Sequence, residues 1–366
     1  MRRLAPILAL AALAASPAAA EIRIGIAGPL TGAVALNGEQ QELGAQVAVR
    51  DLNEAGGVLG QQVVAISADD ACDADQAVAV AGQLVAEEVA VVIGHFCSRT
   101  TIAATEVYDG AGTISISAAS TNPLVTDRGL PGVFRVIGRD DAQATVAVDF
   151  VRARFPDASV ALLHDGNPYG QGLVEGVRDR LVEAGVEPVY FGAFPPGQDS
   201  YAETIAAVAG HAPDVVYAVG NGVSDVAILT SQLKAELPDA VMVSADAIAG
   251  DNFLLVARDA APGTFFTFGP DARALPAAAE IVARFRDEEA FEPAGFTLYA
   301  YAAVQAWAQA AEMAGSADPA AVAEALRSGS FETALGTIGF DEKGDVTGTD
   351  SFVVYEWGET DYGLAE

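Results

Sequence analysis

The sequence predicts an α/β protein with two lobes, each built on a parallel β-sheet. Short runs rich in β-branched residues alternate with longer alanine-rich or amphipathic segments, which is typical of parallel sheets covered by helices on both faces. The alternation forms two series, one from Ile22 to about Gly138 and one from about Asp140 to Phe268. A length of 366 residues and a hydrophobic content of 51% also suit two buried cores.

The β-branched runs define nine expected strands. They are Ile22–Ala27, Val63–Ser67, Val89–Ile93, Thr113–Ser117, Val160–Leu163, Pro188–Phe191, Val215–Val219, Val241–Ser244 and Thr264–Phe268. The later segment Ala277–Gly329 is too helix-rich to form a third sheet, so we expect it to pack on one of the lobes. Residues 340–345 are expected to form a turn between two further strands.

Two of the intervening helices carry start signals. Asn37, with Gln40 three residues later, can cap a helix over Glu39–Ala55. Asp73 and Gln76 form a similar capping box shortly after Cys72.

The first 20 residues have the layout of a secretory signal peptide. Arg2 and Arg3 precede an apolar stretch from Leu4 to Ala15, and small residues lead up to Ala20. We expect cleavage near Ala20 and a periplasmic location, with the helical start of a soluble domain as the alternative. No cysteine at this point can carry a lipid, and no later run reaches the roughly 18 to 20 apolar residues of a bilayer span. No direct membrane insertion is therefore expected.

The charge and the two cysteines narrow the class further. A formal net charge of −31 argues against nucleic acid or anionic lipid as a partner. Cys72 and Cys97 are the only two cysteines, and in an oxidising periplasm such a pair predicts one disulfide. Two buried free thiols are the alternative.

The sequence contains no motif that is typical of a nucleotide-binding site, a hydrolase active site or a metal site. The glycines between Gly28 and Gly38 lack the spacing of a dinucleotide loop, and no phosphate loop or nucleophile elbow occurs. His95, His164 and His211 each stand alone, and the acidic cluster at 69–75 does not fit a calcium loop. We expect no catalysis, no cofactor and no metal.

Polar residues follow several predicted strands, at the edge where ligands of open α/β sheets bind. Ser98 and Thr121, with free N–H groups at a helix start, can hold a carboxylate, although ordinary helix capping also explains them. Asp246 follows the strand Val241–Ser244, where a buried carboxylate needs a cation such as an ammonium group.

Several motifs, in matching order, resemble the periplasmic leucine/isoleucine/valine-binding proteins of ABC importers, and the resemblance covers nearly the whole chain after residue 20. It implies a type I periplasmic-binding fold, with two Rossmann-like lobes joined by a three-crossing hinge. The motifs are Gly28-Pro29-Leu30-Thr31-Gly32, Asp69-Asp70-Ala71-Cys72-Asp73, Ala77–Ala81, Ile93–Ser98, His164-Asp165, Tyr169–Gly172, Tyr299–Ala303 and Phe340–Asp345.

The resemblance also implies roles for single residues. Ser98 and Thr121 match residues that hold the ligand carboxylate, and Ala119 offers a carbonyl to the ammonium group. Tyr169 and Phe296 match the wall around the ligand side chain.

Three positions depart from the family pattern. Asp246 replaces the usual glutamate, so the charge is kept on a shorter side chain. Asn37 and Asn221 stand where tyrosines line the leucine pocket. Two amides in place of two rings indicate a wetter pocket, which penalises a purely aliphatic ligand.

We therefore expect a non-enzymatic periplasmic binding protein, monomeric, that delivers an amino acid to a membrane permease. The expected lobes are 21–138 with 269–347, and 139–268 with 348–366. The alternatives are an enzyme on the same layout, a sensor with a different partner, and a ligand that is an amide, a polyamine or another small carboxylate.

Overall fold

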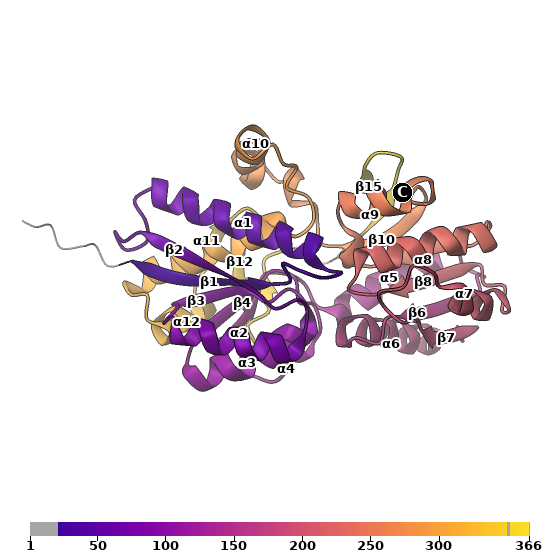
Figure 1. The fold of residues 1–366 in the computed structure, drawn as a ribbon, viewed down its shortest axis with the longest axis horizontal. Coiled ribbons are helices and arrows are strands. Elements are labelled where there is room, and N and C mark those ends of the chain that lie inside the picture. The colour runs from indigo at the N-terminus through magenta and orange to yellow at the C-terminus, as the bar shows by residue number, and fades with distance from the viewer. Residues whose placement is uncertain (1–20, 350–351, 366) are drawn as a thin grey trace, which may run out of the picture.

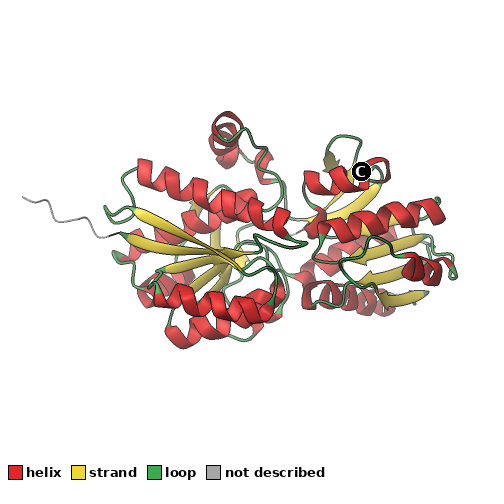
Figure 2. Ribbon diagram, viewed as in Figure 1, coloured by secondary structure: helices red, strands yellow, loops and turns green. Residues whose placement is uncertain are grey.

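The computed structural model describes residues 21–349 and 352–365, so the predicted signal peptide lies outside the described residues. Two α/β bodies, lobe 1 and lobe 2, lie side by side along the long axis (Figure 1). Helices cover both faces of the main sheet in each lobe (Figure 2). In the described part of the chain no helix is long and apolar enough to cross a bilayer.

Lobe 1 is built on a five-stranded parallel sheet in the order β2-β1-β3-β4-β5. Four of these strands were predicted, whereas β5 was missed because a three-residue strand carries no readable periodicity. The bounds are β1 (Ile22–Gly28), β2 (Val63–Asp69), β3 (Val91–Gly94), β4 (Ile114–Ser117) and β5 (Val133–Arg135).

Lobe 2 is built on a seven-stranded sheet in the order β15-β14-β10-β9-β8-β6-β7. The predicted strands β6 to β10 are parallel, but β14 and β15 run antiparallel to their neighbours, so the sheet is mixed. The bounds are β6 (Val160–His164), β7 (Tyr190–Ala193), β8 (Val215–Val219), β9 (Val241–Ser244), β10 (Thr264–Phe268), β14 (Val353–Trp357) and β15 (Tyr362–Leu364).

A small antiparallel sheet, β11-β12-β13, contains β11 (Phe331–Thr333), β12 (Gly336–Phe340) and β13 (Val346–Thr347). The turn between β12 and β13 confirms the turn predicted at residues 340–345. Its Gly344 carbonyl accepts the N–H of Arg135 at 2.9 Å, so the turn is docked on the end of β5.

The helix bounds are α1 (Ala35–Glu54), α2 (Ala74–Ala86), α3 (Ser98–Ala111), α4 (Leu124–Asp127), α5 (Asp140–Arg154), α6 (Pro168–Glu183), α7 (Ala202–Ala209), α8 (Val223–Glu236), α9 (Asp251–Ala257), α10 (Ala279–Glu288), α11 (Thr297–Ala314) and α12 (Pro319–Ser328). Asp73 caps α2 as predicted, because its carboxylate accepts the N–H of Gln76 at 2.9 Å. The predicted cap of α1 is wrong. That helix already begins at Ala35, and Asn37 lies inside its first turn.

Helix α11, from the predicted helix-rich segment, packs against α1 in lobe 1. The two helices approach closely at Gly44, where a Cβ atom would lie 2.1 Å from the carbonyl oxygen of Thr297. A larger residue at this position would push α11 away, and α11 leads directly from the binding cleft described below.

The predicted disulfide between Cys72 and Cys97 is confirmed, with a Cα–Cα distance of 5.7 Å. It ties the loop after β2 to the residue that precedes α3. The start of α3 is thereby held at the carboxyl end of the lobe 1 sheet.

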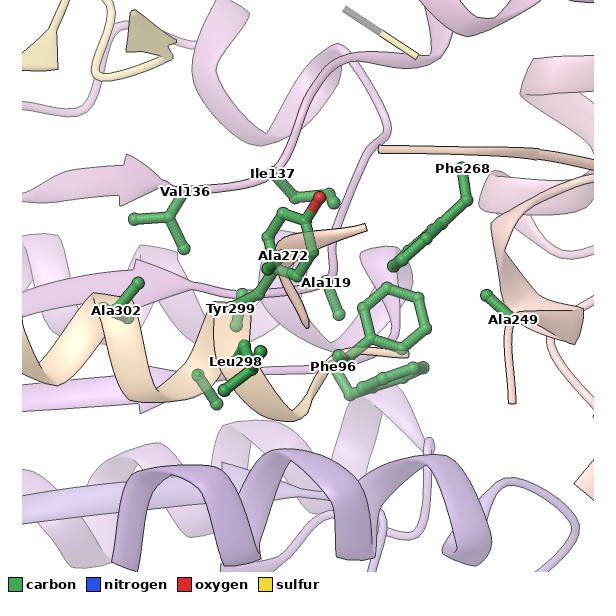
Figure 3. Close-up of a cluster of buried hydrophobic side chains, with 14 of the residues drawn as sticks. Phe96, Ala119, Val136, Ile137, Ala249, Phe268, Ala272, Leu298, Tyr299 and Ala302 are labelled. Atoms are coloured by element: carbon green, nitrogen blue, oxygen red, sulfur yellow. The ribbon is translucent and has the colours of Figure 1, made fainter. Parts of the chain in front are cut away.

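The chain passes between the two main sheets three times, after β5, after β10 and between β13 and β14. A buried hydrophobic cluster lies beside these crossings (Figure 3). Within it Phe96 of lobe 1 and Phe268 of lobe 2 both pack edge-on against Phe296, with ring centroids 4.8 and 5.3 Å apart. These three rings connect the crossings to the cleft between the lobes.

Candidate ligand-binding cleft

A small, narrow pocket lies between the lobes, where strands of both sheets end. Six of the eight ligand-binding residues predicted from the sequence line it, together with two residues that were not predicted. The lining residues are Phe96, Ser98, Ala119, Tyr169, Asn221, Asp246, Ala247 and Phe296.

The N-terminus of α3 points one group of donors at the pocket. Ser98 is its first residue and Cys97, in extended conformation, precedes it. The backbone N–H groups of Ser98 and Arg99 have no partner within the described chain, as the start of a helix requires. The Ser98 hydroxyl accepts the N–H of Asn122 at 3.3 Å, which ties this helix to the loop after β4.

The loop after β4, residues 118–122, is held by hydrogen bonds that leave some of its backbone groups free. The Ser117 hydroxyl accepts the N–H of Ser120 at 3.0 Å and donates to the carbonyl of His95 at 2.8 Å. Among the described residues, the C=O of Ala119 and the N–H of Thr121 remain without a partner. Ala119, which lines the pocket, therefore offers a free acceptor to a ligand, and the free N–H of Thr121 lies two residues further along the loop.

Asp246 supplies a buried carboxylate from lobe 2. It follows β9 in a short 3₁₀ turn and is 2% exposed. One carboxylate oxygen accepts the side-chain N–H of Gln143 and the hydroxyl of Tyr169, each at 2.7 Å. Burial raises the pKa of Asp246 to about 6, although these two hydrogen bonds counter part of the rise. No cation neutralises it by an ion pair within the described residues.

A second buried carboxyl group, Asp140, was missed by the sequence analysis. It is the first residue of α5, directly after the first crossing, and neither carboxyl oxygen has a hydrogen-bond partner in the described chain. Burial, and then the charge of Asp246, raise the pKa of Asp140 to about 8, although the nearby hydroxyl of Thr121 and the charge of Arg135 counter part of the rise. The only sign in the sequence is the pair Asp140-Asp141 at a helix start. Acidic residues are common at that position because they interact favourably with the helix dipole, so the pair does not indicate a binding site.

Two predicted residues lie beside the pocket and do not line it. Thr121 is fully buried, its hydroxyl has no hydrogen-bond partner, and its carbonyl accepts the N–H of Asp140 at 3.0 Å. Asn37 is buried in α1, where its side-chain N–H donates to the carbonyl of Ala247 at 3.2 Å and its side-chain oxygen is unpaired. Asn37 thus bridges the two lobes across the cleft.

Two sheets linked by three crossings, with a cleft at their carboxyl ends, define a two-lobed solute-binding protein.

Comparisons with known proteins place the chain in the same class. Residues 21–361 match the family described as periplasmic binding protein. The chain is 42% identical over 343 residues to an amino acid binding protein of Pseudomonas aeruginosa, covering 93% of this chain and 91% of that one. It is 40% identical over 339 residues to Leu/Ile/Val-binding protein homolog 1 of Brucella abortus, covering 92% and 91%.

The fold is also that of a solved leucine-binding protein from Thermotoga maritima, with a TM-score of 0.87, 24% identity and coverage of 94% and 98%. The chain therefore belongs to the periplasmic binding protein family that includes the Leu/Ile/Val-binding proteins, as the sequence resemblance predicted.

Proposed function

We propose that this protein is a non-enzymatic periplasmic receptor that binds an amino acid between its lobes and delivers it to the permease of an ABC importer. One observation carries the proposal: the pocket has free backbone donors at the start of α3 on one side and the buried carboxylate of Asp246 on the other. A zwitterion presents the complementary pair of charges within a few bond lengths. The names of the relatives, which include amino acid and Leu/Ile/Val-binding proteins, support the same class of ligand.

The donor side binds the α-carboxylate. The N–H groups of Ser98 and Thr121 are unpartnered among the described residues, and the Ser98 hydroxyl lies next to them. A helix N-terminus adds a favourable dipole for an anion. Hydrogen bonds to a charged acceptor are the stronger kind, so this cradle supplies much of the affinity common to all amino acids.

The acceptor side binds the α-ammonium group. Asp246 keeps one carboxylate oxygen free of hydrogen bonds from its neighbours, and the carbonyl of Ala119 is free as well. Asp140 lies close to Asp246, but burial and the charge of Asp246 raise its pKa to about 8, so it stays protonated near neutral pH and adds no charge. An ammonium ion relieves the cost of burying the Asp246 carboxylate, which makes a ligand without a cation a poor fit.

The remaining lining decides the side chain. Phe96, Tyr169 and Phe296 provide apolar contact, whereas Asn221 and the nearby Asn37 provide amides. The amide of Asn221, which lines the pocket, favours a ligand whose side chain can form a hydrogen bond with it. We therefore infer a branched-chain-like or more polar amino acid.

The wider organisation forms part of the proposal. The lobes comprise 21–138 with 269–347, and 139–268 with 348–366. The mature chain begins after Ala20, reaches the periplasm and acts as a monomer.

A thermal-shift screen of the twenty amino acids and related amides tests the proposal. A ligand present at a hundred times its Kd stabilises the folded state by roughly 2.7 kcal/mol, which is easily detected. For each amino acid that responds, the deaminated acid and the carboxamide are the matched controls, and both are expected to respond far less. A response to amides, polyamines or aromatic acids alone would refute the proposal.

A further inference from the structure

The binding loop after β4 is held from behind by one buried arginine. Arg135, the last residue of β5, is 0% exposed. One terminal nitrogen of its guanidinium donates to the carbonyls of Ser120 and Asn122, at 2.9 and 3.0 Å. Its other nitrogens donate to Asp345 and Thr126, each at 2.5 Å. No part of Arg135 lines the pocket.

These contacts determine which way the loop presents its donor. The peptide bond between Ser120 and Thr121 is planar and trans, so its N–H points away from its C=O. Because Arg135 binds the Ser120 carbonyl, the Thr121 N–H is turned away from the guanidinium, and among the described residues this N–H has no partner. We propose that Arg135 is the positioning residue of the carboxylate-binding loop, a role that rests on the proposed function.

An arginine is needed because a single planar group must reach several acceptors at once. A lysine keeps the charge, but its compact ammonium group lacks the planar fork that spans these acceptors. Asp345, which pairs with the guanidinium, also accepts from Arg139 at 3.0 Å at the first crossing. The loop, the β12–β13 turn and the crossing therefore share one ion-pair network.

Three substitutions separate an effect on loop position from an effect on overall stability. Arg135→Lys removes the planar guanidinium group that binds the loop carbonyls. Arg128→Lys is the matched control, because Arg128 also donates to two backbone carbonyls, those of Leu124 and Ile102, but outside the loop. A third variant, Asp345→Asn, weakens the ion pair and leaves the contacts of Arg135 with the loop in place.

Calorimetry with L-leucine and L-leucinamide, which lacks the carboxylate, measures positioning directly. We expect Arg135→Lys to raise the Kd of L-leucine roughly 10- to 100-fold and to reduce the preference for L-leucine over L-leucinamide. Arg128→Lys and Asp345→Asn should keep that preference, even where they lower Tm.

Hydrogen exchange of residues 118–122 in the ligand-free protein gives a second readout. Arg135→Lys should speed exchange there, and Arg128→Lys should not. If exchange and ligand preference in Arg135→Lys match those of the control, the inference is wrong. If the parent protein binds no amino acid, the proposed function fails instead, and the exchange experiment still decides the role of Arg135 in ordering the loop.

Discussion

Replacing Asp246 by asparagine tests the ammonium site most directly. Asparagine has nearly the same shape and its side-chain oxygen can still accept from Gln143 and Tyr169, which donate to Asp246 at 2.7 Å. The substitution therefore removes the charge and keeps the local structure. Truncating one partner of a buried charge pair costs roughly 2 to 5 kcal/mol. The Kd of the best ligand should rise at least about 30-fold.

The pH dependence of binding provides an independent check. Burial raises the pKa of Asp246 to about 6, so below that pH the carboxyl group holds a proton that ammonium binding must displace. The Kd of the parent protein is expected to rise about tenfold per pH unit below pH 6. The Asp246→Asn variant has no carboxyl group to protonate and should not show this rise.

Titration calorimetry between pH 4.5 and 7.5 measures both effects, and Asp225→Asn is the matched control. Asp225 is a buried carboxylate of lobe 2 that accepts from Tyr201 and Gly197 at 2.6 and 2.8 Å, outside the pocket. Binding by Asp246→Asn within threefold of the parent Kd, with the same pH profile, would refute the assignment of the ammonium site.

Three further predictions concern specificity and stability. Asn37→Tyr combined with Asn221→Tyr should shift preference from L-glutamine toward L-leucine, because rings remove unpaired amides and add apolar contact; calorimetry showing an unchanged ratio of the two Kd values would contradict this. Asp140→Asn should stabilise the ligand-free protein at pH 8 by up to a few kcal/mol. The reason is that the folded parent keeps a proton on Asp140 up to about pH 8, whereas the unfolded chain releases it above about 3.8, so parental stability falls as pH rises through this range. Urea unfolding should show no difference in stability between the parent and Asp140→Asn near pH 3.5. Equal stability of the two proteins at pH 8 would contradict the raised pKa of Asp140. Replacing Cys72 and Cys97 by serine should lower the free energy of unfolding by roughly 3 kcal/mol, and an unchanged urea midpoint would show that the bond adds nothing.

The sequence predicted the repeated β-α pattern well because buried parallel strands are marked by their β-branched runs. Strand β5 (Val133–Arg135) and strands β14 and β15 were harder. The first is too short for a pattern, and β14 pairs with β10 across a long intervening segment, while β15 only extends the sheet from β14. No local signal in the chain specifies such a pairing.

Part of the pocket lining could be predicted from the sequence because its residues follow strands. Ser98, Ala119 and Asp246 each follow a strand, and the carboxyl ends of strands meet at the cleft. Asp140 and Arg135 could not be predicted in this way. Asp140 stands out because it is buried near Asp246, and Arg135 because it contacts the loop after β4 and Asp345, and only the folded chain brings these residues together. Asn37 was expected to cap a helix, but α1 begins two residues before it, and its side chain donates instead to the carbonyl of Ala247 in the other lobe.

The return of the C-terminal strands to lobe 2 determines when the protein can finish folding. β14 joins β10 only after α10 to α12 and β11 to β13 have been synthesised. It brings Tyr355 and Trp357 against the ring of Phe266, with centroids 5.5 and 5.9 Å away. Helix α11, which covers lobe 1, is also a late segment. Neither core can therefore be completed before most of the chain has been synthesised, and Trp357 fluorescence should report the final step.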